Sequence, residues 1–155
     1  MGVHRLATTQ VVSAPRDEVW EFFADPRNLA VVTPPWLRLR FTSPPPERVY
    51  AGLVVSYEVR PFLGLPLAWA TEITHVVEGE RFVDDQRVGP YRLWHHQHEL
   101  GDVEGGTEIG DTVHDALPLG PLGDVIARQA VRPRVAAIFD FRRAVLRERF
   151  GPGPE

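Results

Sequence analysis

The sequence predicts an α+β fold, in which a curved antiparallel sheet of about seven strands wraps around one long C-terminal helix, with two short helices after the first strand. Three observations support this prediction. Hydrophobic residues alternate with period two between residues 37 and 117, turn residues interrupt that region at short intervals, and an apolar stripe of helical period runs from residue 124 to residue 149. Because the connections between strands are short, we expect an antiparallel sheet rather than βαβ units.

The N-terminal part of the chain supplies the first strand and the two short helices. Residues 3–12 mix β-branched and polar residues, as strands do. Pro15 is suited to a first helical turn, and Asp17 and Glu18 are suited to the positive end of a helix dipole. We expect this helix to end near Asp25-Pro26 and a second short helix to cover residues 27–32.

Six further strands are predicted in the middle of the chain. Proline, glycine and glutamate residues mark the turns that separate them. The predicted strands cover residues 37–42, 51–60, 67–77, 81–88, 91–101 and 107–117.

The last predicted element is a helix about 40 Å long by the usual rise per residue. Pro133 should either kink this helix or mark its true start. One helix rarely fills the concave side of a long curved sheet, so we expect a cavity between the two. Residues 1–150 are predicted to form a single domain, and residues 151–155 a disordered tail. The apolar stripe consists of Val131, Val135, Ile138, Phe139, Val145 and Leu146.

The composition excludes several kinds of chemistry. All 17 basic side chains are arginine, and the chain has neither lysine nor cysteine. Schiff-base and Walker-type lysines are therefore excluded, and so are thiol nucleophiles and thiolate metal sites. None of the three serines lies in a G-x-S-x-G motif, which argues against the commonest hydrolase design.

Charge and hydropathy exclude two classes of partner. The net charge of −4 argues against nucleic-acid binding. No apolar run approaches the roughly 18 residues of a membrane helix, so no stable membrane insertion is expected. The first residues lack the apolar core of a signal peptide, and we therefore expect a cytoplasmic protein.

Short motifs along nearly the whole chain resemble those of one superfamily. They are Ala14-Pro15, Asp25-Pro26-Arg27-Asn28-Leu29, Thr33-Pro34-Pro35-Trp36, Gly89-Pro90-Tyr91, Trp94-His95-His96-Gln97-His98 and Leu117-Pro118-Leu119-Gly120. In this order they resemble the START-like helix-grip superfamily (SRPBCC), which includes polyketide cyclases and lipid-transfer proteins, and within it small bacterial ligand-binding proteins of unassigned activity. The resemblance implies the helix-grip fold but no particular activity, because this scaffold hosts many functions. One departure is Asp115, which stands where the resemblance leads us to expect an aromatic residue.

Two histidines are expected on the concave face of the sheet. Alternation along strand 91–101 places His96 and His98 on the same face as Trp94 and Leu100, whose size indicates that this face points inward. If the next turn lies near Glu104-Gly105, then His98 is opposite Asp111, His96 opposite Val113 and Trp94 opposite Asp115.

Three interpretations of this histidine–carboxylate group remain open. His98 and Asp111 could simply be a hydrogen-bonded pair that stabilises the sheet. They could instead orient a ligand, or His96, His98 and Asp111 could carry out acid–base catalysis. Metal binding by His96 and His98 with Asp111 ranks fourth, since the chain has no H-E-x-x-H motif, and we predict no metal and no cofactor.

Arg142 lies in the middle of the apolar stripe. We expect its stem to pack while its guanidinium group reaches solvent. The alternative is a cavity cation that meets an anionic ligand or offsets Asp111 or Asp115.

Together these observations predict a protein that binds a small, mostly hydrophobic molecule, such as a lipid, a polyketide or an aromatic compound. The alternatives are a cofactor-independent cyclase or aromatase that uses a His–Asp pair, and a protein-interaction module centred on Trp36 and Phe62. We interpret the apolar tip at residues 62–65 as the mouth of the cavity first and as a homodimer contact second. Gln86 joins the predicted site because it shares a strand face with Phe82. The predicted ligand-binding residues are Trp69, Phe82, Gln86, Trp94, His96, His98, Asp111, Asp115, Ile138 and Arg142.

Overall fold

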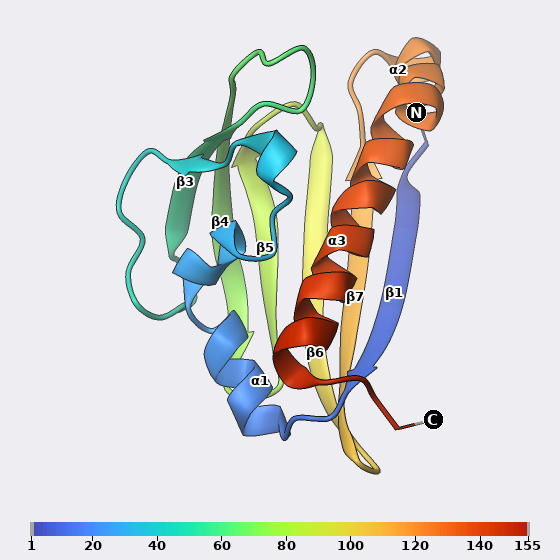
Figure 1. Ribbon diagram of the computed structural model, residues 1–155. Coiled ribbons are helices and arrows are strands. Elements are labelled where there is room, and N and C mark those ends of the chain that lie inside the picture. Colours follow the sequence, from blue (N-terminus) through green and yellow to red (C-terminus); the bar gives the residue numbers. More distant parts are fainter. Residues whose placement is uncertain (1, 155) are drawn as a thin grey trace.

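A computed structural model, which describes residues 2–154, confirms the predicted α+β helix-grip fold (Figure 1). Seven antiparallel strands form one sheet in the order β1-β7-β6-β5-β4-β3-β2. Strands β2 to β7 are thus neighbours in chain order, as short connections require, and β1 joins the sheet beside β7. The strands are β1 (His4–Val12), β2 (Arg40–Phe41), β3 (Val54–Val59), β4 (Leu67–Val77), β5 (Arg81–Val88), β6 (Leu93–Val103) and β7 (Gly106–Ala116).

Strands β2 and β3 are shorter than predicted. Residues Pro35–Leu37 form a short 3₁₀ helix, η2, and Arg38 follows it in the left-handed conformation with φ of 50°. A left-handed residue cannot continue an extended strand, so β2 begins only at Arg40. In the same way Gly52, with φ of 96°, holds a turn that delays the start of β3.

The short helices form where the sequence predicts them. Helix α1 (Arg16–Phe23) follows Pro15, and Asp17 and Glu18 lie in its first turn. The 3₁₀ helix η1 (Pro26–Ala30) comes next, and the side chain of Asp25 caps it by accepting a hydrogen bond from the backbone N–H of Arg27 at 3.0 Å.

The C-terminal helical region runs from Gly120 to Phe150 in three segments. They are α2 (Gly120–Ile126), a π-helical turn η3 (Ala127–Val131) and α3 (Arg132–Phe150). Pro133 lies in the first turn of α3. Since proline has no N–H and its ring collides with the carbonyl four residues earlier, the wider π turn accommodates it. Pro133 therefore marks the start of the long helix, which is one of the two predicted alternatives.

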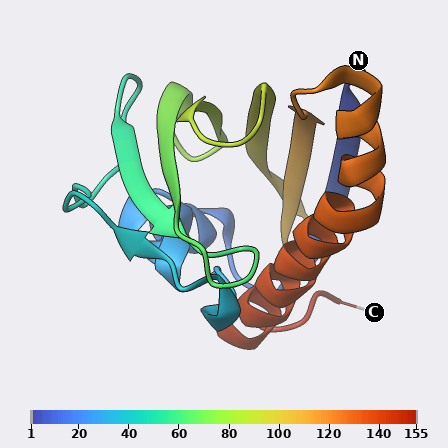
Figure 2. The ribbon, with the colours of Figure 1, turned by 90° about the horizontal axis from the view of Figure 1, so that it is seen from above.

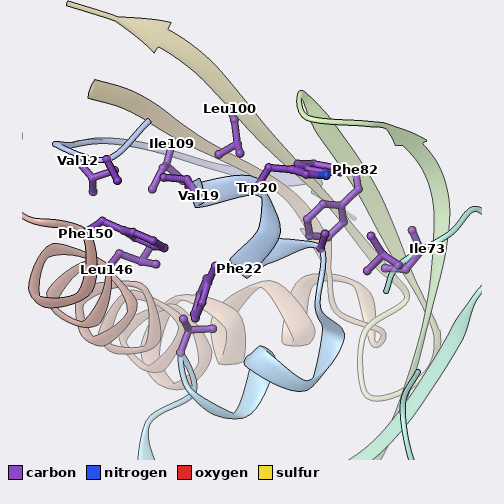
Figure 3. Packing of buried hydrophobic residues seen from close by; sticks show 14 of the residues in the cluster. Val12, Val19, Trp20, Phe22, Ile73, Phe82, Leu100, Ile109, Leu146 and Phe150 are labelled. Carbon is purple, nitrogen blue, oxygen red and sulfur yellow. The ribbon is translucent and has the colours of Figure 1, made fainter. Parts of the chain in front are cut away.

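A hydrophobic cluster fills the end of the fold where α1 meets the C-terminal half of α3 (Figure 3). Leu146 and Phe150 of α3 are buried there, and the Phe150 ring meets Phe22 of α1 edge-on, with ring centroids 5.5 Å apart. Val12 and Ile109 of the sheet belong to the same cluster. This packing fixes the C-terminal end of α3 against the sheet.

The residues after α3 lie against β1. The backbone N–H of Ser13 donates to the carbonyl of Gly151 at 3.3 Å, and Pro152 forms an isolated bridge with Val12. Residues 151–154 of the predicted disordered tail thus have defined contacts. Among the described residues, no helix is long and apolar enough to cross a membrane.

Candidate functional site

A pocket of about 610 Å³ lies between the concave face of the sheet and α3. Seen from above, the sheet forms a curved wall and α3 stands opposite β3 and β4 (Figure 2). Most side chains that line the pocket are apolar or aromatic. They include Val55, Trp69, Phe82, Trp94, Ile138 and Phe139.

The apolar stripe of the long helix is divided between this pocket and the hydrophobic cluster. Ile138 and Phe139 line the pocket, whereas Leu146 belongs to the cluster. Arg142 lies between these two groups in sequence, at the boundary of the hollow and filled parts of the fold. The inward face of β6 is divided in the same way, because His98 lines the pocket and Leu100 belongs to the cluster.

The predicted register between β6 and β7 is confirmed. His98 is opposite Asp111, His96 opposite Val113 and Trp94 opposite Asp115. A single oxygen of Asp111, Oδ1, lies 2.8 Å from His96 Nε2, 3.2 Å from His98 Nδ1 and 3.1 Å from Arg142 Nη2. This carboxylate therefore accepts hydrogens from three side chains on two elements.

A second carboxylate, Asp84 of β5, completes the cluster. Its Oδ2 lies 2.6 Å from His98 Nε2, and its Oδ1 accepts a hydrogen bond from the Thr71 hydroxyl at 3.1 Å. Sequence reasoning did not choose Asp84 as a site residue. The alternation that places Phe82 inward also places Asp84 inward, and this pattern could have identified it.

The prediction that the Arg142 guanidinium group reaches solvent is wrong. Arg142 is only 9% exposed, and its Nη2 donates to Asp111. The guanidinium carbon also lies 5.0 Å from the centre of the Phe23 ring, which favours a buried cation. Its Nε is buried and has no hydrogen-bond partner among the described residues. The alternative, in which Arg142 offsets Asp111, describes the observed contact.

Both carboxylates of the cluster are held in the ionised form. Burial would raise the pKa of Asp111, but the positive charge of Arg142 and the hydrogen bonds from His96 and His98 hold it well below its ordinary value. Burial also opposes ionisation of Asp84, and there the hydrogen bond with His98 and the charge of His98 lower the pKa.

The pKa values of the two histidines shift in opposite directions. Burial opposes the charge of His98, yet its hydrogen bonds to Asp111 and Asp84 raise its pKa. For His96, burial and the neighbouring charge of His98 outweigh the hydrogen bond to Asp111, so its pKa is lowered. The ring centroids are 3.7 Å apart, and two positive rings at that distance would repel each other. One ring thus tends to be protonated and the other neutral, which is the arrangement that acid–base chemistry requires.

Aromatic side chains form the part of the sheet wall next to His96, whose ring centroid lies 6.4 Å from that of Trp94. Tyr57 stacks on Trp69, with ring centroids 6.1 Å apart, and Trp69 meets the edge of Trp94 at 5.6 Å. Burial, followed by the negative charge of Asp84, raises the pKa of Tyr57 well above its ordinary value. Its phenol therefore stays protonated and can donate a hydrogen bond. Tyr57 is not among the predicted ligand-binding residues, although its place on a predicted strand could have indicated the pocket.

Seven of the predicted ligand-binding residues line the pocket, and three do not. Asp111 is absent from the lining and contacts His96 and His98, which do line the pocket. The Gln86 amide is held away from the pocket, because it donates to the carbonyl of Tyr91 at 2.6 Å and accepts from the Tyr91 N–H at 3.1 Å. Asp115 lies 3.1 Å from His4 Nδ1 of the neighbouring strand β1 and is also absent from the lining. The lining members are Trp69, Phe82, Trp94, His96, His98, Ile138 and Arg142.

The apolar tip between β3 and β4 lies beside the pocket. Phe62 and Leu65 are exposed to solvent and also line the pocket. The guanidinium carbon of Arg134, on α3, lies 4.6 Å from the centre of the Phe62 ring and 5.5 Å from that of Trp36. Two loops and the helix thus meet at this edge of the pocket.

Residues 10–150 match the family model described as "Domain of unknown function (DUF8410)". The chain belongs to this family. No curated protein matches the sequence of this DUF8410 chain.

Solved structures share the fold of the DUF8410 chain at low sequence identity. Protein Ms6760 from Mycobacterium smegmatis has a TM-score of 0.66 and 20% identity, over 96% of this chain and 98% of that chain. The major latex-like protein 151 from Panax ginseng has a TM-score of 0.69 and 13% identity, over 97% and 99%. Ara h 8.0201 has a TM-score of 0.63 and 18% identity, over 94% and 99%. The helix-grip fold that the resemblance implied is therefore confirmed.

Proposed function

We propose that this DUF8410 protein binds a small, mostly hydrophobic molecule in the pocket between the sheet and α3. One observation carries the proposal: the pocket of about 610 Å³ has mostly apolar and aromatic walls, and Asp84, His96 and His98 form a polar cluster on its sheet side. Small-molecule sites typically have volumes of roughly 300–1,000 Å³ and combine apolar walls with a few convergent polar groups.

The two parts of the wall suggest how such a ligand lies. Burial of its apolar surface against Trp69, Trp94 and Ile138 supplies the affinity, at roughly 25 cal/mol per Å² before the costs of association. Its polar end faces His96 and His98, whose rings line the pocket. Ligands of lipid, polyketide or aromatic type fit this description.

A cavity-filling variant tests the proposal. Ile138→Trp places a large ring in the pocket, whereas Ala137→Trp places the same ring on the exposed side of α3. With the fluorescent probe 8-anilino-1-naphthalenesulfonate, we expect Ile138→Trp to weaken binding at least about tenfold and Ala137→Trp to leave it nearly unchanged.

Equal binding by both variants would place the probe outside the pocket and overturn the proposal. If Ile138→Trp does not fold, as judged by circular dichroism, Val135→Trp fills the pocket from another turn of α3. Native mass spectrometry of protein purified from its own host would identify the natural ligand. Finding no bound molecule there, and no thermal shift with a lipid and polyketide library, would count against ligand binding.

A second candidate function is that of a cofactor-independent enzyme of the cyclase or aromatase type. The observation that favours it is the pair of neighbouring imidazoles, His96 and His98, which border the pocket and have opposite pKa shifts. The neutral ring would remove a proton from an activated carbon, and a protonated group would assist the loss of water. Catalysed deuterium exchange at the central carbon of a 1,3-diketone, lost in His96→Gln, would support this function, and exchange no faster than in buffer would exclude it for this substrate class.

The third candidate, a protein-interaction module centred on Trp36 and Phe62, has less support. Arg134 lies over both rings, and Phe62 borders the pocket. These contacts favour a role for the apolar loops as the mouth of the pocket.

A further inference from the structure

Three potential metal ligands converge on one point of the pocket wall. They are Asp84 from β5 and His96 and His98 from β6, and one ligand atom from each lies within 4.8 Å of the other two. Asp84 Oδ2 is 2.6 Å from His98 Nε2 and 3.9 Å from His96 Nδ1. A tetrahedral ion with bonds of about 2.0–2.2 Å separates its ligands by roughly 3.3 Å, a value between these two distances. Small side-chain rotations would therefore equalise them.

The far nitrogens of both imidazoles meet a second carboxylate. His96 Nε2 lies 2.8 Å and His98 Nδ1 3.2 Å from the same oxygen of Asp111. Metal-binding histidines almost always donate their other N–H to such a partner, which fixes the tautomer and turns the lone pair toward the ion. Asp84 thus occupies the inner position and Asp111 the outer position of a carboxylate–histidine arrangement.

The gap between Asp84 and His96 also favours a cation. In the neutral His96 ring, Nε2 carries the hydrogen because it faces Asp111, and Nδ1 is left with a lone pair. This nitrogen lies 3.9 Å from Asp84 Oδ2, which is also an electron-pair donor. A cation between the two atoms would satisfy both of them.

We propose that Asp84, His96 and His98 form a binding site for one divalent first-row transition-metal ion. Two imidazoles and one carboxylate suit Zn²⁺, Fe²⁺ or Co²⁺ better than Mg²⁺ or Ca²⁺, which prefer oxygen ligands throughout. All three residues line the pocket, so the remaining coordination positions face it. Sequence reasoning ranked metal binding last and paired the histidines with Asp111, whereas the structure gives the inner position to Asp84.

Arg142 is compatible with a metal ion in this position. Its nearest acceptor is the outer carboxylate, with Nη2 3.1 Å from Asp111 Oδ1. Metal binding requires both imidazoles to be neutral, and in that state the two carboxylates and Arg142 carry one net negative charge, which attracts a divalent cation. The metal site itself does not depend on the proposed organic ligand.

The test uses the outer face of the same two strands as its control. Asp85 and His95 lie there at the same distance, 2.6 Å, as Asp84 and His98 within the pocket. Protein treated with a chelator and dialysed is titrated with Co²⁺, followed by visible ligand-field absorption, and with Zn²⁺ in competition. We expect one Co²⁺ per chain, displaced by Zn²⁺, with affinity at least about a hundredfold lower in Asp84→Asn and within about twofold of wild type in Asp85→Asn.

Several outcomes would overturn the metal site. One is the absence of Co²⁺ and Zn²⁺ binding in wild type. Another is a loss of affinity in Asp85→Asn or His95→Gln as large as that in Asp84→Asn. That result would place the ion on the outer face, where His114 lies opposite His95. If Asp84→Asn does not fold, His98→Gln replaces it.

Asp111→Asn should weaken Co²⁺ binding by about 10–100-fold, which is the usual effect of removing an outer hydrogen-bond partner of metal-binding histidines. Ile138→Trp keeps all three ligands, so retained Co²⁺ binding with loss of the fluorescent probe separates the two proposals.

Discussion

Strands β5 and β6 carry two histidine–aspartate pairs on opposite faces. On the concave face, His98 Nε2 lies 2.6 Å from Asp84 Oδ2, and on the convex face, His95 Nδ1 lies 2.6 Å from Asp85 Oδ1. The two pairs have the same chemistry, the same contact distance and neighbouring positions in the sequence. They differ in what surrounds them.

The inner pair is enclosed and connected, whereas the outer pair is partly hydrated. The side chains of His98 and Asp84 are 11% and 14% exposed, and those of His95 and Asp85 are 33% and 28% exposed. The inner pair also contacts Asp111 and Thr71. Electrostatic interactions strengthen where water is excluded, and exposed pairs contribute little. The contact distance alone therefore does not indicate how much a pair stabilises the fold or what chemistry it can perform.

The largest difference in stability between the two faces should follow the loss of the Asp111 carboxylate, which three side chains share. Asp111→Ala removes the acceptor of His96, His98 and Arg142 and leaves the Arg142 guanidinium buried without its partner. Breaking a buried ion pair in this way costs about 3–5 kcal/mol of unfolding free energy. Asp85→Ala, on the convex face, should cost under about 1 kcal/mol. Urea denaturation at pH 7 measures both.

A companion double variant tests the cause. In Asp111→Leu/Arg142→Met neither charge is buried, so most of the lost stability should return. If the double variant is as unstable as Asp111→Ala, lost packing rather than the unpaired guanidinium group explains the effect. The comparison of the two faces would then lose its electrostatic basis.

The sequence predicted the sheet and the inward position of the histidines, because both depend on local patterns. Period-two alternation chose the face of His96, and the short turn near Gly105 fixed the register that puts His98 opposite Asp111. These relations depend only on the β6–β7 hairpin. Asp84 lies on β5, and its contact with His98 depends on the pairing of β5 with β6.

Contacts between distant elements could not be predicted in the same way. The partner of Arg142 lies 31 positions earlier in the chain, on β7, so the helix pattern alone favoured a route to solvent. Asp115 was expected to line the pocket, but it faces His4, which is 111 positions away. Gln86 lies on the expected strand, but its amide donates a hydrogen bond to the backbone carbonyl of Tyr91. In each case the side chain is oriented by a hydrogen-bond partner that alternation does not reveal.

A smaller difference is expected when the partner carboxylate on each face is made neutral. Asp84→Asn keeps the shape of the side chain but replaces the charged oxygen that accepts a hydrogen bond from His98. The variant should lose about 1.5–3 kcal/mol of unfolding free energy, the usual contribution of a hydrogen bond to a charged group. Asp85→Asn should cost at most about 1 kcal/mol because water can replace the contact. Urea denaturation of both variants, in the presence of a chelator, measures the difference. Equal costs on the two faces would contradict the role assigned to burial.

The smallest expected effect is the pH dependence of stability within the inner cluster. His98 is faced by Asp84 from β5, His96 from β6, Asp111 from β7 and Arg142 from α3, and its pKa is raised in the folded state. A raised folded pKa gives a stabilising contribution that is complete below the unfolded value of about 6.5 and is lost as the pH rises through the folded value. The stability advantage of wild type over His98→Gln should therefore shrink as the pH rises above about 6.5.

His96→Gln provides the opposite case from the same strand. The folded pKa of His96 is lowered, so its contribution is present above about 6.5 and is lost as the pH falls. Urea denaturation of metal-free wild type and both variants between about pH 5.5 and 8.5 should give free-energy differences with slopes of opposite sign. Slopes of the same sign would mean that the two rings do not divide one proton between them. The inner pair would then differ from the outer pair only in its exposure to water, and the acid–base candidate function would lose the asymmetry on which it depends.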